Sequence, residues 1–119
     1  MTKKEQRIYD LLFAQEVTLK NLIDNIYLEN YKNIEIYKTD TSICAELTCR
    51  VNDSKKGMVT YTYDFSPVSG LLMRLRQIVV GEIAYETLYD RVKEYKKLTG
   101  NDWDKVRASI MKDTRENKP

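Results

Sequence analysis

The chain has 119 residues and a net charge of +2, with 42% hydrophobic side chains, 32% charged side chains and no histidine. This length and balance are typical of one folded domain and exclude wholesale disorder. Without histidine the chain lacks the commonest general base and the commonest metal ligand, which excludes Ser-His-Asp and Cys-His catalysis and a typical structural zinc site.

The distribution of charge bears on the class of partner. The 20 Lys and Arg side chains and the 18 Asp and Glu side chains are spread over both halves of the chain. A nucleic-acid binder usually concentrates its basic residues, and a DNA mimic is strongly acidic. The sequence has neither pattern.

No segment predicts export or membrane insertion. No apolar run approaches the ~20 residues that span a bilayer, and the charged start leads into an amphipathic pattern instead of a signal peptide. Cys44 and Cys49 lie on one predicted strand and point to opposite faces, so they cannot form a disulfide. We expect a cytoplasmic protein with Cys49 in the core and Cys44 half-exposed.

The first thirty residues predict helical structure. Gln15 and Glu16 interrupt the apolar stripe, and Thr18 is a suitable N-cap for a second segment. The sequence is compatible with one helix over about 3–30 or with two helices that meet near 16–18. The stripe has helical three- and four-residue spacing and consists of Ile8, Leu11, Leu12, Leu19, Leu22, Ile23, Ile26 and Tyr27.

The next segment predicts three antiparallel strands. Ile34 and Ile36 alternate with polar neighbours in a short first strand, and a two-residue turn at Thr39–Asp40 leads into a hairpin over 42–66. In that hairpin the odd positions are apolar, so the second loop must contain an odd number of residues. One such register places Glu46 opposite Asp64, and we expect a shift of two residues that avoids this like-charge pair.

Three helices are predicted after the strands. Ser66 and Pro67 form a helix start, followed by a broad apolar face that ends at Gly81. A second helix is predicted over about 83–98, and a third over about 102–115 before a polar tail at 113–119. The predicted fold is therefore a single α+β domain over 1–119: an N-terminal helix or helix pair, a three-stranded antiparallel β-meander, and three C-terminal helices packed on one sheet face.

This order of elements resembles, in topology, the double-stranded-RNA-binding domain. That family opens its second helix with a lysine cluster, whereas the corresponding stretch here, 66–71, contains no lysine. The order is also similar to that of some small phage-encoded inhibitors of bacterial defence nucleases, several of which are acidic DNA mimics. Such resemblances carry fold and not function.

Two charged groups on the predicted helix over 83–98 have a structural explanation. Glu82, Glu86 and Asp90 recur every four residues and could hold a divalent cation, but acidic residues at a helix N-terminus and lysines at its C-terminus complement the helix dipole. The lysines at 93, 96 and 97, with Arg91, could contact phosphates, but a solvated helix face explains them better. We predict no metal, no cofactor and no catalytic residue.

The predicted function is protein binding without catalysis. Outward tyrosines and arginines are enriched in protein interfaces. We therefore expect an inhibitor or accessory factor of the kind that phages and mobile elements carry, for example in anti-defence. The alternative is a nucleic-acid-binding transcriptional regulator that uses the helices over 83–98 and 102–115. The predicted partner-binding residues are Tyr37, Arg50, Arg74 and Arg76.

Overall fold

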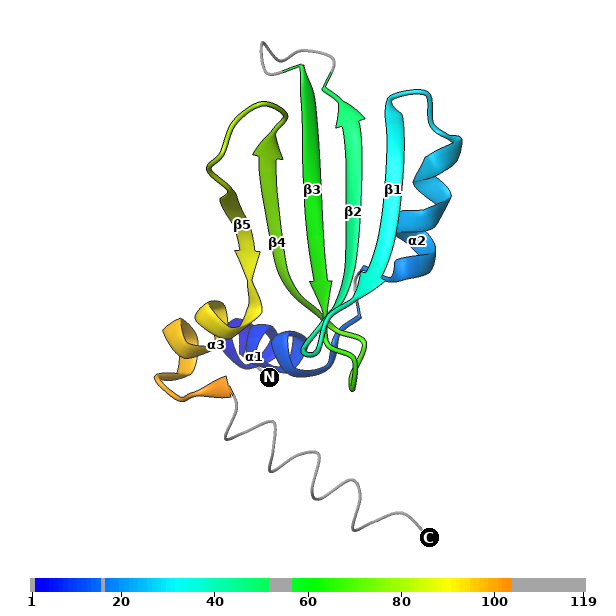
Figure 1. Ribbon diagram of the computed structural model, residues 1–119. Helices are drawn as coiled ribbons and strands as arrows, with labels where there is room; N and C mark the ends of the chain where they lie inside the picture. Colours follow the sequence, from blue (N-terminus) through cyan, green and yellow to red (C-terminus); the bar gives the residue numbers. More distant parts are fainter. Residues whose placement is uncertain (1, 16, 52–56, 104–119) are drawn as a thin grey trace, which may run out of the picture. The chain divides into compact units, whose positions relative to one another are not determined.

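The computed structural model describes residues 2–15, 17–51 and 57–103. The chain divides into two compact units, one formed by residues 1–14 and 91–119 and the other by residues 15–90. Figure 1 labels the elements of both. None of the described helices is long and apolar enough to cross a membrane.

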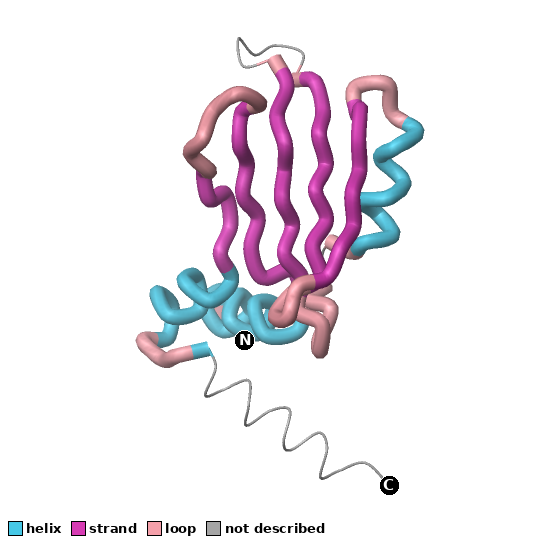
Figure 2. The backbone as a smooth tube through the Cα atoms, in the orientation of Figure 1, coloured by secondary structure: helices cyan, strands magenta, loops and turns pink. Residues whose placement is uncertain are grey.

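The unit of residues 15–90 is built on a five-stranded antiparallel sheet (Figure 2). Each strand pairs with the next one along the chain, so the strand order is β1-β2-β3-β4-β5. The strands are β1 (Tyr31–Lys38), β2 (Ile43–Arg50), β3 (Met58–Phe65), β4 (Leu72–Val79) and β5 (Glu86–Asp90).

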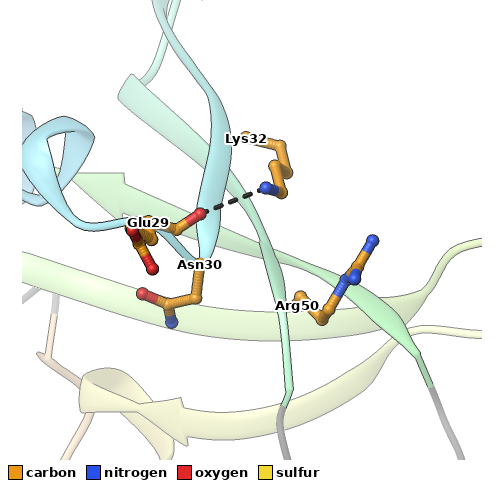
Figure 3. A pocket seen from close by; sticks show the side chains of 4 residues that line it. All are labelled: Glu29, Asn30, Lys32 and Arg50. Atoms are coloured by element: carbon orange, nitrogen blue, oxygen red, sulfur yellow. Dashed lines mark hydrogen bonds between the residues drawn. The ribbon is translucent and has the colours of Figure 1, made fainter.

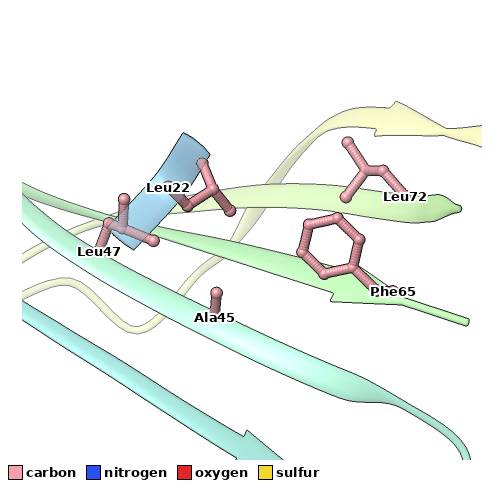
Figure 4. Close-up of a cluster of buried hydrophobic side chains, with 5 residues drawn as sticks. All are labelled: Leu22, Ala45, Leu47, Phe65 and Leu72. Atoms are coloured by element: carbon pink, nitrogen blue, oxygen red, sulfur yellow. The ribbon is translucent and has the colours of Figure 1, made fainter. Parts of the chain in front are cut away.

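One sheet face carries the apolar core of this unit. The helix α2 (Leu19–Asp24) begins at Thr18, whose hydroxyl accepts a hydrogen bond from the Asn21 N–H at 3.3 Å, and a short 3-10 helix, η1 (Asn25–Tyr27), follows. Leu22 is 5% exposed and joins the side chains of the odd-numbered positions of β2 and β3. The buried cluster, drawn in Figure 4, consists of Leu22, Ala45, Leu47, Phe65 and Leu72.

The other unit contains two helices, α1 (Lys3–Phe13) and α3 (Arg91–Thr99). Thr2 and Glu5 form a capping box at the start of α1. Its C-terminal end is closed by Arg91, whose guanidinium is buried and donates to the carbonyls of Asp10 (3.2 Å), Leu11 and Ala14 (3.4 Å). The Asp10 carbonyl also accepts from the Ala14 N–H at 2.9 Å, and Arg91 adds donors for the carbonyls at this helix end, where intrahelical partners run out.

The predicted three-stranded sheet with three C-terminal helices is wrong. Residues 72–79 form β4, because β3 pairs with them along its free edge. Ser66 does not cap a helix but closes a turn: its hydroxyl accepts from the N–H groups of Val68 and Ser69, and Gly70 leaves the turn at φ +75°. The β-branched run Ile78–Val80 also favours a strand over a helix.

The second C-terminal helix is shorter than predicted. Residues 86–90 pair with β4 as β5, and α3 begins only at Arg91. The predicted helix over 102–115 and the polar tail at 113–119 lie outside the described residues beyond Trp103. Because the resemblances above depended on a helix directly after the third strand, the structure does not support them.

The strand registers test the turn predictions. In the first hairpin the predicted turn at Thr39–Asp40 would place Ile36 opposite Ile43, whereas Ile36 lies opposite Ala45. The Thr39 hydroxyl accepts from the N–H groups of Thr41 and Ser42 and fixes the turn at 40–41 instead. In the second hairpin Glu46 lies opposite Thr62, which confirms the expected shift away from Asp64.

The two-helix alternative for the N-terminal region is also confirmed.

Candidate protein-contact surface

The face of the sheet opposite α2 carries a polar network. Two rows of directly opposed residues run across it, one from Tyr37 through Cys44 and Asp64 to Arg74, and the other from Glu35 through Glu46 and Thr62 to Arg76. Directly opposed residues in antiparallel strands share one face. We call this surface the polar face; its members are Glu35, Tyr37, Cys44, Glu46, Thr62, Asp64, Arg74 and Arg76.

Asp64 is the centre of the polar face. Its carboxylate is buried, with the residue only 6% exposed, and accepts three hydrogen bonds. Cys44 Sγ donates to Oδ1 at 3.1 Å, while Arg74 Nε and Arg76 Nη2 donate to Oδ2 at 3.1 and 3.4 Å. A buried carboxylate is stable only with such partners. Because both arginines donate to the same oxygen of Asp64, this carboxylate holds the two guanidinium groups side by side.

The two arginines are exposed to different extents. Arg74 has 45% of its side chain exposed and Arg76 has 26%. Arg76 also lies over the ring of Tyr85, with 5.0 Å between its guanidinium carbon and the ring centroid. Its Nε and the Thr62 hydroxyl are buried without a hydrogen-bond partner among the described residues. The network therefore leaves part of its hydrogen-bonding capacity unused among the described residues.

Tyr37 and Glu46 form the other end of the polar face. The tyrosine hydroxyl donates to Glu46 Oε1 at 2.6 Å, and this bond, with a smaller contribution from burial, raises the pKa of Tyr37 well above its ordinary value. Burial, together with the bond to Asp64, raises the pKa of the Cys44 thiol to about 11. Both groups stay protonated at neutral pH and act as hydrogen-bond donors.

The structure brings together three of the four predicted contact residues. Tyr37, Arg74 and Arg76 share the polar face, although the last two lie on a strand and not on the predicted helix. Arg50 is six residues from Cys44 along β2, or ~20 Å away. It lines an open pocket of about 630 Å³ with Glu29, Asn30 and Lys32 (Figure 3).

Sequence reasoning missed Asp64 and Tyr85 as members of the site. Asp64 lies on the polar side of a predicted strand, and only the pairing with β4 shows what it holds. Tyr85 lies in the stretch predicted as a helix over 83–98, but 51% of it is exposed and its ring contacts the Arg76 guanidinium. The expectation for Cys44 was also wrong, since it is 4% exposed; the prediction that Cys44 and Cys49 are unpaired is confirmed.

The charged groups of the C-terminal region also differ from their predicted setting. Glu82, Glu86 and Asp90 do not share a helix face, because Glu86 and Asp90 lie on β5, where Glu86 accepts from Gln77 at 2.9 Å. Within the described part of the chain no three acidic or cysteine side chains are grouped as metal ligands. Arg91 is buried at the end of α1 and does not belong to a solvated lysine face.

Comparisons of the chain with protein-family models, with curated proteins and with solved structures gave no match.

Proposed function

We propose that this protein is a small, non-enzymatic, cytoplasmic binding module that acts through protein–protein contact, and that the polar face is its contact surface. The observation that carries the proposal is the pair of arginines held by one buried carboxylate, Asp64. Arginine and tyrosine are the residues that most often dominate protein interfaces. The module would serve as an inhibitor or accessory factor of the kind that phages and mobile elements carry.

The rigidity of the surface supports this proposal. Arg76 is held at two points, by Asp64 and by the ring of Tyr85, and Tyr37 is held by Glu46. Side chains that are already ordered lose little conformational entropy when a partner binds. The cost of ordering the contact surface is therefore largely met during folding.

The signs of the charges favour a protein over a nucleic acid. The polar face has three carboxylates, those of Glu35, Glu46 and Asp64, beside two guanidinium groups. Phosphate backbones require an excess of basic side chains, whereas mixed signs suit a partner with complementary charges of its own. The helix over 83–98, on which the nucleic-acid alternative depended, is a strand for residues 86–90.

The protonation of the polar face supports binding over catalysis. A nucleophilic thiol needs a lowered pKa, and the pKa of the Cys44 thiol is raised instead. The Tyr37 hydroxyl is likewise held protonated by Glu46. Both groups suit a hydrogen-bonded surface.

Affinity capture with matched variants tests this proposal. The tagged protein is incubated with extract of its native host, and bound proteins and nucleic acid are quantified for the wild type and for single Tyr37→Ala, Arg74→Ala and Arg76→Ala variants. We expect a specific protein whose recovery falls at least about tenfold in the Arg76→Ala variant. Arg50→Ala is the control, because Arg50 lies far along β2.

Two outcomes would contradict the proposal. If every captured protein binds the three variants as well as the wild type, the polar face is not the contact surface. If the protein captures only nucleic acid, with an affinity that falls steeply as salt rises, the nucleic-acid alternative is correct.

A further inference from the structure

The two edges of the sheet differ in how they are protected. The β5 edge is five residues long, and its pairing with β4 is interrupted by a register shift. The β1 edge is eight residues long, and its one register shift, between Tyr31 and Asn33, leaves 33–38 regular. A long, regular edge strand offers unpaired backbone groups to another strand.

The hydrogen-bond pattern shows which β1 residues point away from β2. The Thr39 N–H donates to the Ser42 carbonyl at 2.9 Å, so these two residues form a hydrogen-bonded pair that closes the turn. Hydrogen-bonded and non-hydrogen-bonded pairs alternate along an antiparallel ladder. The N–H and C=O groups of Ile34, Ile36 and Lys38 therefore point outward from the sheet.

Exposed apolar side chains lie along this edge. Ile36 is 44% exposed, and in η1, which contacts β1, Tyr27 is 87% exposed. Leu22 anchors α2 in the cluster with Ala45 and Leu47 of β2, and residues 35–38 of β1 are all exposed. An open edge flanked by exposed apolar groups is a site for strand pairing.

We propose that two copies of this chain pair through β1, antiparallel and about a two-fold axis at Ile36, to form one continuous sheet. In such a dimer the two-fold axis passes through one residue of β1, which pairs with its own copy, and the choice of that residue defines the register of the two strands. An axis at Glu35 would place this carboxylate against its own copy, a destabilising like-charge pair. An axis at Ile34 would run the pairing into the irregular segment at 31–33 and shorten it.

The axis at Ile36 avoids both problems. It pairs Ile34 of one copy with Lys38 of the other and Glu35 with Tyr37 of the other, so no like charges are opposed across 34–38. The outward groups of Ile34, Ile36 and Lys38 form about six backbone hydrogen bonds in total. On the α2 side of the sheet, the two exposed Ile36 side chains cover one another.

Disulfide trapping tests the proposed register. In this register the Ile36 Cα atoms of the two copies lie ~5.5 Å apart, which suits a disulfide. The Ile36→Cys variant should therefore form covalent dimers under mild oxidation. The Lys38→Cys variant should not, because its two Cα atoms are ~13 Å apart. The native Cys44 and Cys49 are buried, so the wild-type protein should form no covalent dimer and serves as the negative control.

Sedimentation equilibrium tests the association itself. The wild type should shift from 14.0 kDa toward twice that mass as concentration rises. Ile36→Lys, which opposes two lysines on the axis, should weaken dimerisation at least about tenfold. Ile83→Lys is the matched control, since Ile83 is 98% exposed between β4 and β5. A wild type that stays monomeric at ~1 mM, equal effects of the two lysine variants, or equal trapping of the two cysteine variants would overturn the proposal.

Discussion

Arginine is used in two different ways in the two units of this protein. Arg91 is 5% exposed, and its guanidinium donates to three backbone carbonyls at the end of α1. Arg74 and Arg76 lie on a sheet face, remain partly exposed and share one carboxylate oxygen of Asp64. The first arrangement completes a helix terminus, whereas the second fixes two cations at a surface where a partner can reach them.

The comparison shows that the role of an arginine follows from the group that accepts its hydrogen bonds, because the residue type is the same in both places. An arginine whose guanidinium satisfies backbone carbonyls at a helix end stabilises that helix terminus and so belongs to the scaffold. A side-chain carboxylate orients an arginine and leaves its other N–H groups for a further acceptor. Variants at the two places should therefore separate stability from binding.

Loss of Arg91 should have the largest effect on stability. Arg91→Met keeps most of the apolar stem but removes the guanidinium bonds to the backbone carbonyls of Asp10, Leu11 and Ala14 at the end of α1, and we expect a loss of about 3 kcal/mol in unfolding free energy. Urea denaturation measures it. Arg7→Met, which removes an exposed ion pair with Glu94 in the same unit, should cost less than about 1 kcal/mol. Equal losses would contradict a scaffold role for Arg91.

Loss of the Asp64 charge should rank second. Asp64→Asn keeps the shape of the side chain but weakens its bonds to both arginines, and we expect a loss of about 2 kcal/mol. The arginines can turn toward solvent, which limits the cost. Asp24→Asn, on the exposed side of α2, is the control for a changed carboxylate. If thermal unfolding shows equal shifts, the Asp64 network contributes nothing specific.

Alkaline pH should weaken the unit of residues 15–90 by a smaller amount. The folded pKa of Cys44 is about 11, above its ordinary 9.0, and that of Tyr37 is raised as well. A raised folded pKa gives stability that is complete below pH 9 and is lost as pH rises through 11. We expect a decline of about 1 to 2 kcal/mol over this range.

Chemical denaturation at several pH values measures the alkaline decline. Cys44→Ala should lower stability at neutral pH and then lose less on going from pH 9 to 11, because it has no thiol to ionise. A decline of the same size in the variant would show that other groups, such as lysines elsewhere in the chain, cause the alkaline loss.

Local pattern predicted the elements whose partners are close in sequence. The strict alternation over 43–65 predicted the β2–β3 hairpin and the parity of its pairing, while avoidance of the like-charge pair Glu46–Asp64 favoured the observed register. Thr18 predicted the start of α2. Leu71, Leu72, Leu75 and Ile78 have helical spacing, yet they lie in or next to β4. That strand is decided by β3, which offers an unpaired edge, and tertiary pairing outweighs local periodicity there.

The candidate site also combines residues that local sequence pattern indicates with residues whose roles depend on tertiary pairing. Tyr37, Arg74 and Arg76 were predicted as contact residues from residue type and outward placement, and they share one sheet face although the two arginines lie on a strand and not on a helix. Their role in binding stays a prediction. Asp64 and Tyr85 were not identified, because their roles depend on which strands are neighbours. Arg50 has the right residue type but lies at the other end of β2.

The contact between Arg76 and Tyr85 should have the smallest effect, and it tests how firmly the second arginine is held. Tyr85→Ala removes the ring that Arg76 covers and should cost about 0.5 kcal/mol, the usual value for an exposed cation–π contact. Tyr27→Ala is the control, because Tyr27 is 87% exposed and makes no ring contact among the described residues. A double-mutant cycle with Arg76→Lys separates this contact from the bond to Asp64. If the coupling is zero, Asp64 alone orients Arg76, and the polar face would be less rigid toward a partner than we propose.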